Sequence, residues 1–93
     1  MIDILKVKKD DIIKFNKHFH FIINDQLNFS NQIGKVVSTN NNEVIIKLKK
    51  HFPDLLDWNN CLVFSSDEEE GNFYEGVKVS ILGRANELSW WND

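Results

Sequence analysis

Two runs of alternating residues, joined by three asparagines, constrain the fold of this chain more than any other feature. Residues 43–49 place apolar side chains at every second position, which is the pattern of a strand with one face in water. Residues 33–39 are rich in β-branched side chains, which pack well on a pleated surface. Asparagines 40–42 suit a tight connection, since asparagine tolerates positive φ. The pattern predicts a β-hairpin with Val44, Ile46 and Leu48 in the core and Lys47 and Lys49 in water.

Short runs of the same kind recur along the rest of the chain. We expect further strands at 10–16, 18–23, 61–65 and 77–81, separated by turn-forming residues at intervals of about 8–12 residues. The apolar segment 2–7 is expected to pair at a sheet edge. Strands of this number and length are typical of a small barrel or sandwich.

The segment that follows the hairpin interrupts the strand pattern. Pro53 lacks the N–H that a central sheet ladder requires, but it suits the first position of a helical turn, and Asp54 suits the positive end of that turn. We therefore expect one short helical turn. Its large apolar side chains are predicted to plug an open end of the barrel, namely Phe52, Leu55, Leu56 and Trp58.

Size and composition fit one globular domain over residues 1–93. A chain of 93 residues with 42% apolar residues is large enough for a single modest core. The only cysteine, Cys61, excludes an internal disulfide and favours a reducing compartment. No apolar run approaches the ~20 residues of a membrane span, and the first residues lack the apolar stretch of a secretion signal. We expect a cytoplasmic protein, of the cell itself or of an infected host cell, that does not bind membranes.

The order of these elements resembles the opening of an SH3-like barrel. Residues 11–15, a long loop, the run Ile33-Gly34-Lys35-Val36-Val37 and the strand at 43–48 are similar to the KOW sub-type, in which a glycine precedes a G-x-V strand. The similarity covers residues 10–65. It implies a mainly β fold: a small SH3-like barrel of five to six short antiparallel strands with one short helical turn. The chain departs from the KOW pattern in carrying only Lys35 as a basic residue around the glycine, which counts against nucleic-acid binding.

The charge of the chain is unevenly distributed. The net charge is −3, but residues 1–50 carry nine lysines against five acidic residues, whereas residues 51–93 carry two basic residues against nine acidic ones. An acidic second half argues against a general polyanion-binding protein, because phosphate binding depends on a basic surface. The sequence also has no G-x-S-x-G elbow, phosphate-binding glycine loop or paired-carboxylate setting, so we expect neither enzymatic activity nor a cofactor.

Two features after residue 65 are candidates for contact with a partner. The acidic run at 67–70 suits a basic protein surface, although a solvated hairpin tip of this kind needs no function. Trp90 and Trp91 are adjacent and would point to opposite faces of a strand, so that one is exposed at an interface or caps a sheet edge. The candidate partner-binding residues are Asp67, Glu68, Glu69, Glu70, Trp58, Trp90 and Trp91.

Two other groups of residues have a functional and a structural interpretation. His18 and His20 share one strand face and have a spacing that can chelate a metal, but no further ligand signature accompanies them, and exposed histidines on a strand are the simpler interpretation. Basic residues near the N-terminus alternate with aromatic ones, which suits single-stranded nucleic acid unless the aromatics are core residues. These residues are Lys6, Lys8, Lys9, Lys14 and Lys17, with Phe15, Phe19 and Phe21.

These observations favour a non-enzymatic protein-binding module whose partner has a basic surface. The composition suits a phage or mobile-element protein that blocks a host factor, and residues 52–60 look like a segment found in small phage-encoded proteins. The alternative hypothesis is a KOW-like nucleic-acid or ribosome-associated module that uses the lysines of the first half. Salt dependence separates the two, since counterion release makes nucleic-acid affinity fall steeply as salt rises.

Overall fold

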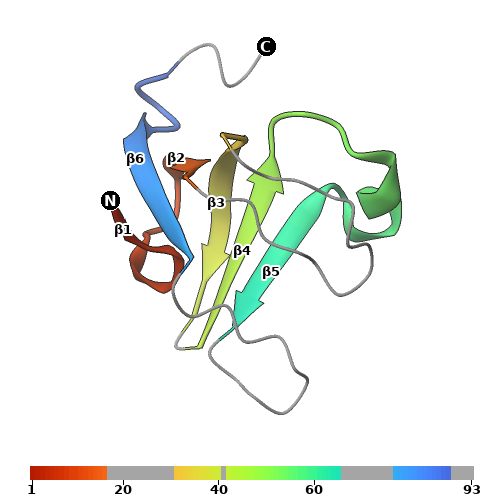
Figure 1. Cartoon of the computed structure of the whole chain (residues 1–93), viewed down its shortest axis with the longest axis horizontal. Helices are drawn as coiled ribbons and strands as arrows, with labels where there is room; N and C mark the ends of the chain where they lie inside the picture. The colour runs from red at the N-terminus through yellow and green to blue at the C-terminus, as the bar shows by residue number, and fades with distance from the viewer. Residues whose placement is uncertain (17–30, 41, 66–76, 89–93) are drawn as a thin grey trace.

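A computed structural model describes residues 1–16, 31–40, 42–65 and 77–88 of this chain. In these ranges, six strands form one antiparallel sheet in the order β1-β6-β2-β3-β4-β5 (Figure 1). Two short 3-10 helices, η1 and η2, complete the described elements. The predicted mainly β fold is therefore confirmed. The strands are β1 (Ile2–Asp3), β2 (Asp11–Phe15), β3 (Ile33–Thr39), β4 (Glu43–Leu48), β5 (Cys61–Ser65) and β6 (Lys78–Arg84), and the helices are η1 (Ile4–Lys6) and η2 (Pro53–Trp58).

The alternating pattern correctly predicts the hairpin of β3 and β4, which lies between β2 and β5 in the sheet. At its turn the Asn40 N–H donates to the Glu43 carbonyl at 2.9 Å, and the Asn40 side chain accepts from the Asn42 N–H at 3.1 Å. The side chain of Asn40 thus takes part in the turn. Among the described residues, which leave out Asn41, the asparagines with a positive φ are Asn31, Asn59 and Asn60. The predicted strand at 18–23 lies outside the described residues.

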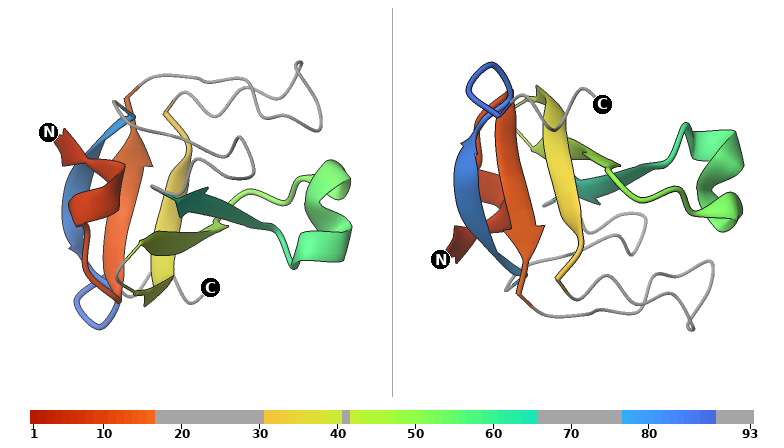
Figure 2. Two further views of the ribbon diagram at one scale, coloured as in Figure 1. Left: turned by 90° about the horizontal axis from the view of Figure 1, so that it is seen from below. Right: turned by 90° about the horizontal axis from the view of Figure 1, so that it is seen from above.

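Local irregularities curl the sheet toward a half-barrel. The register shifts between Ile12 and Ile13 against β6, and between Val36 and Ser38 against β4, and such bulges increase the local twist. At Gly34 a Cβ atom would lie 2.5 Å from Cγ2 of Ile46, so only glycine allows β3 and β4 to pack as they do there. Figure 2 shows the resulting curvature of the sheet.

The inner face of the curled sheet holds one hydrophobic core. The rings of Phe15 and Phe64 meet across it with centroids 5.8 Å apart. The η1 helix contacts β4 and β5, and its Ile4 side chain is fully buried in this core. Val44, Ile46 and Leu48 of β4 are buried there, while Lys47 and Lys49 are exposed, which confirms the predicted faces of the hairpin. The other core residues are Val7, Ile13, Val36, Phe52, Leu55, Leu62 and Val79.

The prediction for the segment after β4 is correct for the turn and wrong for two of its side chains. Pro53 begins η2, and Phe52 and Leu55 are buried in the core. Leu56 and Trp58 are exposed instead, with 69% and 41% of their surfaces accessible. In a 3-10 turn residues three apart share a face, so Leu56 points away from the face that Phe52 and Leu55 present to the core. The backbone of Leu55 is non-helical, with φ of −105° and ψ of 16°, which interrupts this repeat before Trp58. In the described ranges no helix combines the length and apolar character needed to cross a bilayer.

The face assignment of β4 can be tested by truncation. We expect Leu48→Ala to lower the free energy of unfolding by roughly 2–5 kcal/mol, because it leaves a cavity in the core. Lys47→Ala on the outer face should change it by no more than about 0.5 kcal/mol. Urea denaturation of both variants measures the difference, and equal losses would contradict the assignment.

Candidate functional site

The turn of η2 is fixed at both ends by its own sequence. Pro53 occupies the first helical turn, where a backbone N–H would have no partner within the helix, so its lack of an N–H costs no hydrogen bond. At the other end Asn59 and Asn60 adopt left-handed backbone angles, with φ of 56° and 61°. Their N–H groups donate to the carbonyls of Leu56 at 3.2 Å and Leu55 at 2.9 Å, which closes the turn. Asparagine tolerates these angles better than most residues, which explains why two asparagines stand there.

The side chain of Asn60 ties this turn to the end of β4. Its Oδ1 accepts from the Phe52 N–H at 2.9 Å, and its Nδ2 donates to the carbonyls of Leu48 at 3.0 Å and Lys50 at 2.9 Å. One amide group thus satisfies three main-chain groups of the connecting loop. The loop that carries η2 is therefore held in one shape, and this contact is called the Asn60 clamp below.

The exposed side of η2 combines apolar and acidic side chains. Figure 2 shows η2 at the end of the β4–β5 connection, where it projects away from the β1–β6–β2 side of the sheet. We call its exposed residues the η2 knob. A large exposed aromatic beside aliphatic and acidic groups is typical of protein contact surfaces. The knob consists of Pro53, Asp54, Leu56, Asp57 and Trp58.

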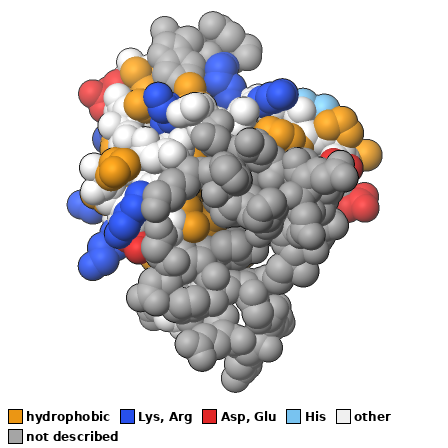
Figure 3. Space-filling view, in the orientation of Figure 1, with side chains coloured by type: hydrophobic (Ala, Val, Ile, Leu, Met, Phe, Trp, Pro, Cys, Tyr) orange, Lys and Arg blue, Asp and Glu red, His pale blue; other side chains and the backbone are white. Residues whose placement is uncertain are grey.

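A basic surface borders the knob across a shallow cavity. The cavity has a volume of about 370 Å³ and lies between the end of β4 and the knob. Its lining combines the basic residues Lys47 and Lys49 and His51 with Leu56 and Asn59 of the η2 segment. Figure 3 shows this part of the surface, where basic side chains (blue) and histidine (pale blue) are followed by hydrophobic (orange) and acidic (red) side chains toward η2.

Four lysines share the outer face of the sheet. Lys14, Lys35 and Lys47 alternate with core residues along β2, β3 and β4, and Lys49 continues the alternation beyond β4. Lys35 lies directly opposite Lys47 in the β3–β4 ladder, and the Lys49 N–H donates to the Ile33 carbonyl at 2.8 Å. Like charges that face each other across a ladder repel. We call these four residues the lysine face.

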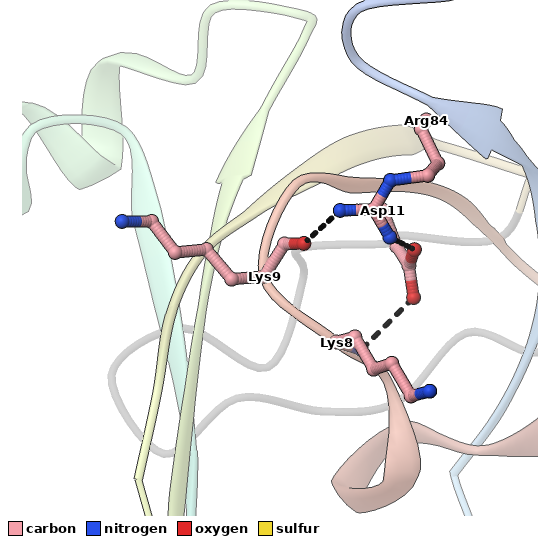
Figure 4. A network of polar contacts seen from close by, with 4 residues as sticks. All are labelled: Lys8, Lys9, Asp11 and Arg84. Atoms are coloured by element: carbon pink, nitrogen blue, oxygen red, sulfur yellow. Dashed lines mark hydrogen bonds and ion pairs between the residues drawn. The ribbon is translucent and has the colours of Figure 1, made fainter.

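A second polar cluster, at the β2–β6 end of the sheet, has a structural role. The buried carboxylate of Asp11 accepts from the Lys8 N–H at 2.9 Å and pairs with the Arg84 guanidinium at 3.2 Å (Figure 4). Arg84 also donates to the Lys9 carbonyl at 3.1 Å. Both guanidinium contacts fasten the turn before β2 to the end of β6. A polar cavity of about 390 Å³ beside them is lined by Asp10, Lys35, Arg84 and Asn86.

The structure places only part of the predicted site. Trp58 is exposed on η2, as a partner-binding residue must be. The other predicted partner-binding residues, Asp67, Glu68, Glu69, Glu70, Trp90 and Trp91, lie outside the described residues, as do the metal-site candidates His18 and His20. Within the described ranges, no three histidine, cysteine or acidic side chains lie close enough together to hold a metal ion.

Sequence reasoning missed three features of this site. It predicted that Leu56 plugs the open end of the barrel, and it gave no role to Asn60. It also grouped lysines by closeness in the chain, from Lys6 to Lys17, whereas the lysine face gathers residues from three strands. Part of the lysine face could have been predicted from the period-two pattern of β4, because that pattern places Lys47 and Lys49 on one face.

Comparisons with protein-family models, with curated proteins and with solved structures found no match for this chain. The function therefore has to be inferred from the geometry of the chain itself.

Cys61 provides a probe of the electrostatics of the outer face. Partial burial raises the pKa of its thiol, and the neighbouring ammonium of Lys47, opposite it in the β4–β5 ladder, lowers that pKa in part. We expect Lys47→Ala to raise the thiol pKa further and to slow alkylation by iodoacetamide at about pH 8, because the thiolate is the nucleophile. Lys8→Ala is the control and should leave the rate unchanged. An equal or faster rate in Lys47→Ala would contradict this electrostatic assignment.

Proposed function

We propose that this chain is a non-enzymatic protein-binding module and that the η2 knob is its contact surface. The observation that carries the proposal is the exposure of Leu56 and Trp58 on a turn that the Asn60 clamp holds in place. Large apolar side chains that are exposed on an ordered surface are the usual anchors of a protein interface. Because the turn is already ordered, little conformational entropy is lost when it binds.

The charges of the knob favour a partner with a basic surface. Asp54 precedes the two apolar anchors in the turn, Asp57 lies between them, and both are exposed. Carboxylates at the rim of an interface steer the encounter and select a partner of opposite charge. The acidic run at 67–70 would add to the same selection. The proposal that the chain is a phage or mobile-element inhibitor of a host factor rests on its composition and on residues 52–60.

A second candidate function uses the lysine face. Lys35 and Lys47 stand opposite each other without a carboxylate between them in the ladder, an arrangement that costs stability unless an anion binds there. The described residues of these rows include no aromatic side chain, so a nucleic acid would be held through its phosphates rather than by base stacking. This candidate corresponds to the KOW-like alternative.

The first candidate predicts that truncating the knob weakens binding to a protein. The partner is isolated from a host lysate with the wild-type chain, identified and purified, and its dissociation is then measured by surface plasmon resonance. We expect Trp58→Ala to increase the dissociation rate about 30-fold, as for a hot-spot residue worth about 2 kcal/mol. Leu82→Ala is a matched control, since Leu82 is exposed to a similar extent, 42%, on β6. Equal rates for the Trp58→Ala and Leu82→Ala variants would contradict the proposal.

The second candidate predicts steep salt dependence. Fluorescence anisotropy of a labelled single-stranded oligonucleotide between about 50 and 200 mM salt measures it. If the lysine face binds phosphates, K35Q/K47Q should reduce the slope of log affinity against log salt by about 1.4, or about 0.7 for each lysine lost. K8Q/K9Q is the control with the same loss of charge. Absence of binding by the wild type at the lower salt concentration would exclude this candidate.

A further inference from the structure

We propose that the cavity between β4 and η2 receives an acidic segment of the protein partner. A side-chain carboxylate of that segment binds against Lys47 and His51, and an aliphatic side chain beside it packs against Leu56. The inference rests on the proposed function, because it names a chemical group of the partner that binds next to the η2 knob. The partner then carries this acidic group beside the basic surface that faces Asp54 and Asp57.

The described lining of the cavity offers hydrogen-bond donors and includes no acidic side chain. Lys47 contributes an ammonium group, His51 an imidazole and Asn59 a side-chain amide, each of which can donate. Within the described part of the chain, none of these three side chains takes part in a hydrogen bond or an ion pair. Donors without an acceptor around a cavity suit an anion, since a carboxylate accepts several hydrogen bonds and donates none.

The Asn60 clamp fixes the main chain that carries the basic side chains. Its Nδ2 donates to the carbonyls of Leu48 and Lys50, and its Oδ1 accepts from the Phe52 N–H. Residues 49–51 therefore start from a fixed backbone, which lowers the entropy lost when their side chains bind a ligand. Both amide hydrogens of Asn60 are used in these bonds, so the donors that remain for a ligand come from the other lining residues.

The strand register gives Lys47 a further reason to bind a carboxylate. Lys47 stands opposite Lys35 in the β3–β4 ladder, and like charges that face each other across a ladder repel. A carboxylate held in the cavity would offset this repulsion and would form a charge-assisted hydrogen bond with the ammonium of Lys47.

Leu56 favours a peptide over a nucleic acid as the source of the anion. Its side chain lines the cavity and is 69% exposed, so an aliphatic residue of the partner would remove apolar surface from water on both sides. The described lining contains no aromatic ring on which a base could stack. With a volume of about 370 Å³, the cavity is within the range of ordinary ligand sites, about 300–1,000 Å³.

Amide NMR titration of the isotopically labelled chain with two short capped peptides tests the inference. In the first peptide a glutamate stands between leucines, and in the second a glutamine replaces the glutamate. The glutamate peptide should shift the amides of residues 47–51 and 56–60, and its affinity should fall as salt rises, because the contact is ionic. The glutamine peptide should bind about fivefold more weakly or less well still, because it lacks the charge.

Single substitutions then locate the contact. Lys47→Gln should weaken binding of the glutamate peptide about fivefold, and His51→Gln should also weaken it, because each removes a donor from the lining. Lys8→Gln is the matched control, since it loses the same charge as Lys47→Gln at an exposed position that is not part of the lining. It should bind the glutamate peptide like the wild type.

Several results would overturn the inference. They are the absence of shifts at up to about 10 mM peptide, equal affinities for the two peptides, equal weakening by Lys47→Gln and Lys8→Gln, and shifts confined to the surroundings of Lys14 and Lys35. A single-stranded oligonucleotide that perturbs the cavity amides at lower concentration than the glutamate peptide would also overturn it, by assigning the cavity to nucleic acid.

The same experiments separate this inference from the proposed function. If Trp58→Ala releases the captured partner faster but the glutamate peptide does not bind, the proposed function holds and only the inference about the cavity fails. If the glutamate peptide binds at the cavity but Trp58→Ala leaves the release of the partner unchanged, the cavity binds acidic peptides and the proposed role of the knob fails.

Discussion

The inward row of β4 is the constraint on which the rest of the structure depends. Val44, Ile46 and Leu48 pack into the core, and β4 pairs with β3 on one side and β5 on the other. The position of this row requires glycine at Gly34, because any Cβ there would meet Ile46. It also sends Lys47 and Lys49 outward, since neighbours in a strand point to opposite faces. The core and the basic side of the candidate site thus follow from one alternating sequence.

The end of this row is also where the fold positions the knob. Leu48 is the last residue of β4, and its carbonyl accepts from the Asn60 amide. The same amide group binds the main chain of Phe52 and Lys50, so the loop cannot rotate freely about the strand end. Phe52 and Leu55 anchor the inner side of the turn in the core. Leu56 lies off that inner side, and the non-helical backbone of Leu55 interrupts the turn before Trp58, so both side chains are exposed.

Sequence reasoning recovers the elements that have a clear period and loses those that depend on contacts distant in the chain. The hairpin, β5 and the Pro53 turn follow from alternation and from the chemistry of proline. The orientation of Leu56 does not follow from the sequence. Four apolar residues lie close together in this segment, and only the packed core shows which two of them are buried. The Asn60 clamp joins groups up to twelve residues apart, and nothing local marks it. The lysine face depends on strand register, which periodicity in one strand does not determine.

The central claim is that the η2 knob is the surface through which this chain contacts a protein. It is tested most directly by amide NMR spectra of the isotopically labelled chain, recorded with and without its captured protein partner. The account predicts that the perturbed amides cluster between residues 47 and 60, around the cavity and η2. Perturbations confined to β2 and β3 around Lys14 and Lys35, with the amides of η2 unchanged, would contradict it.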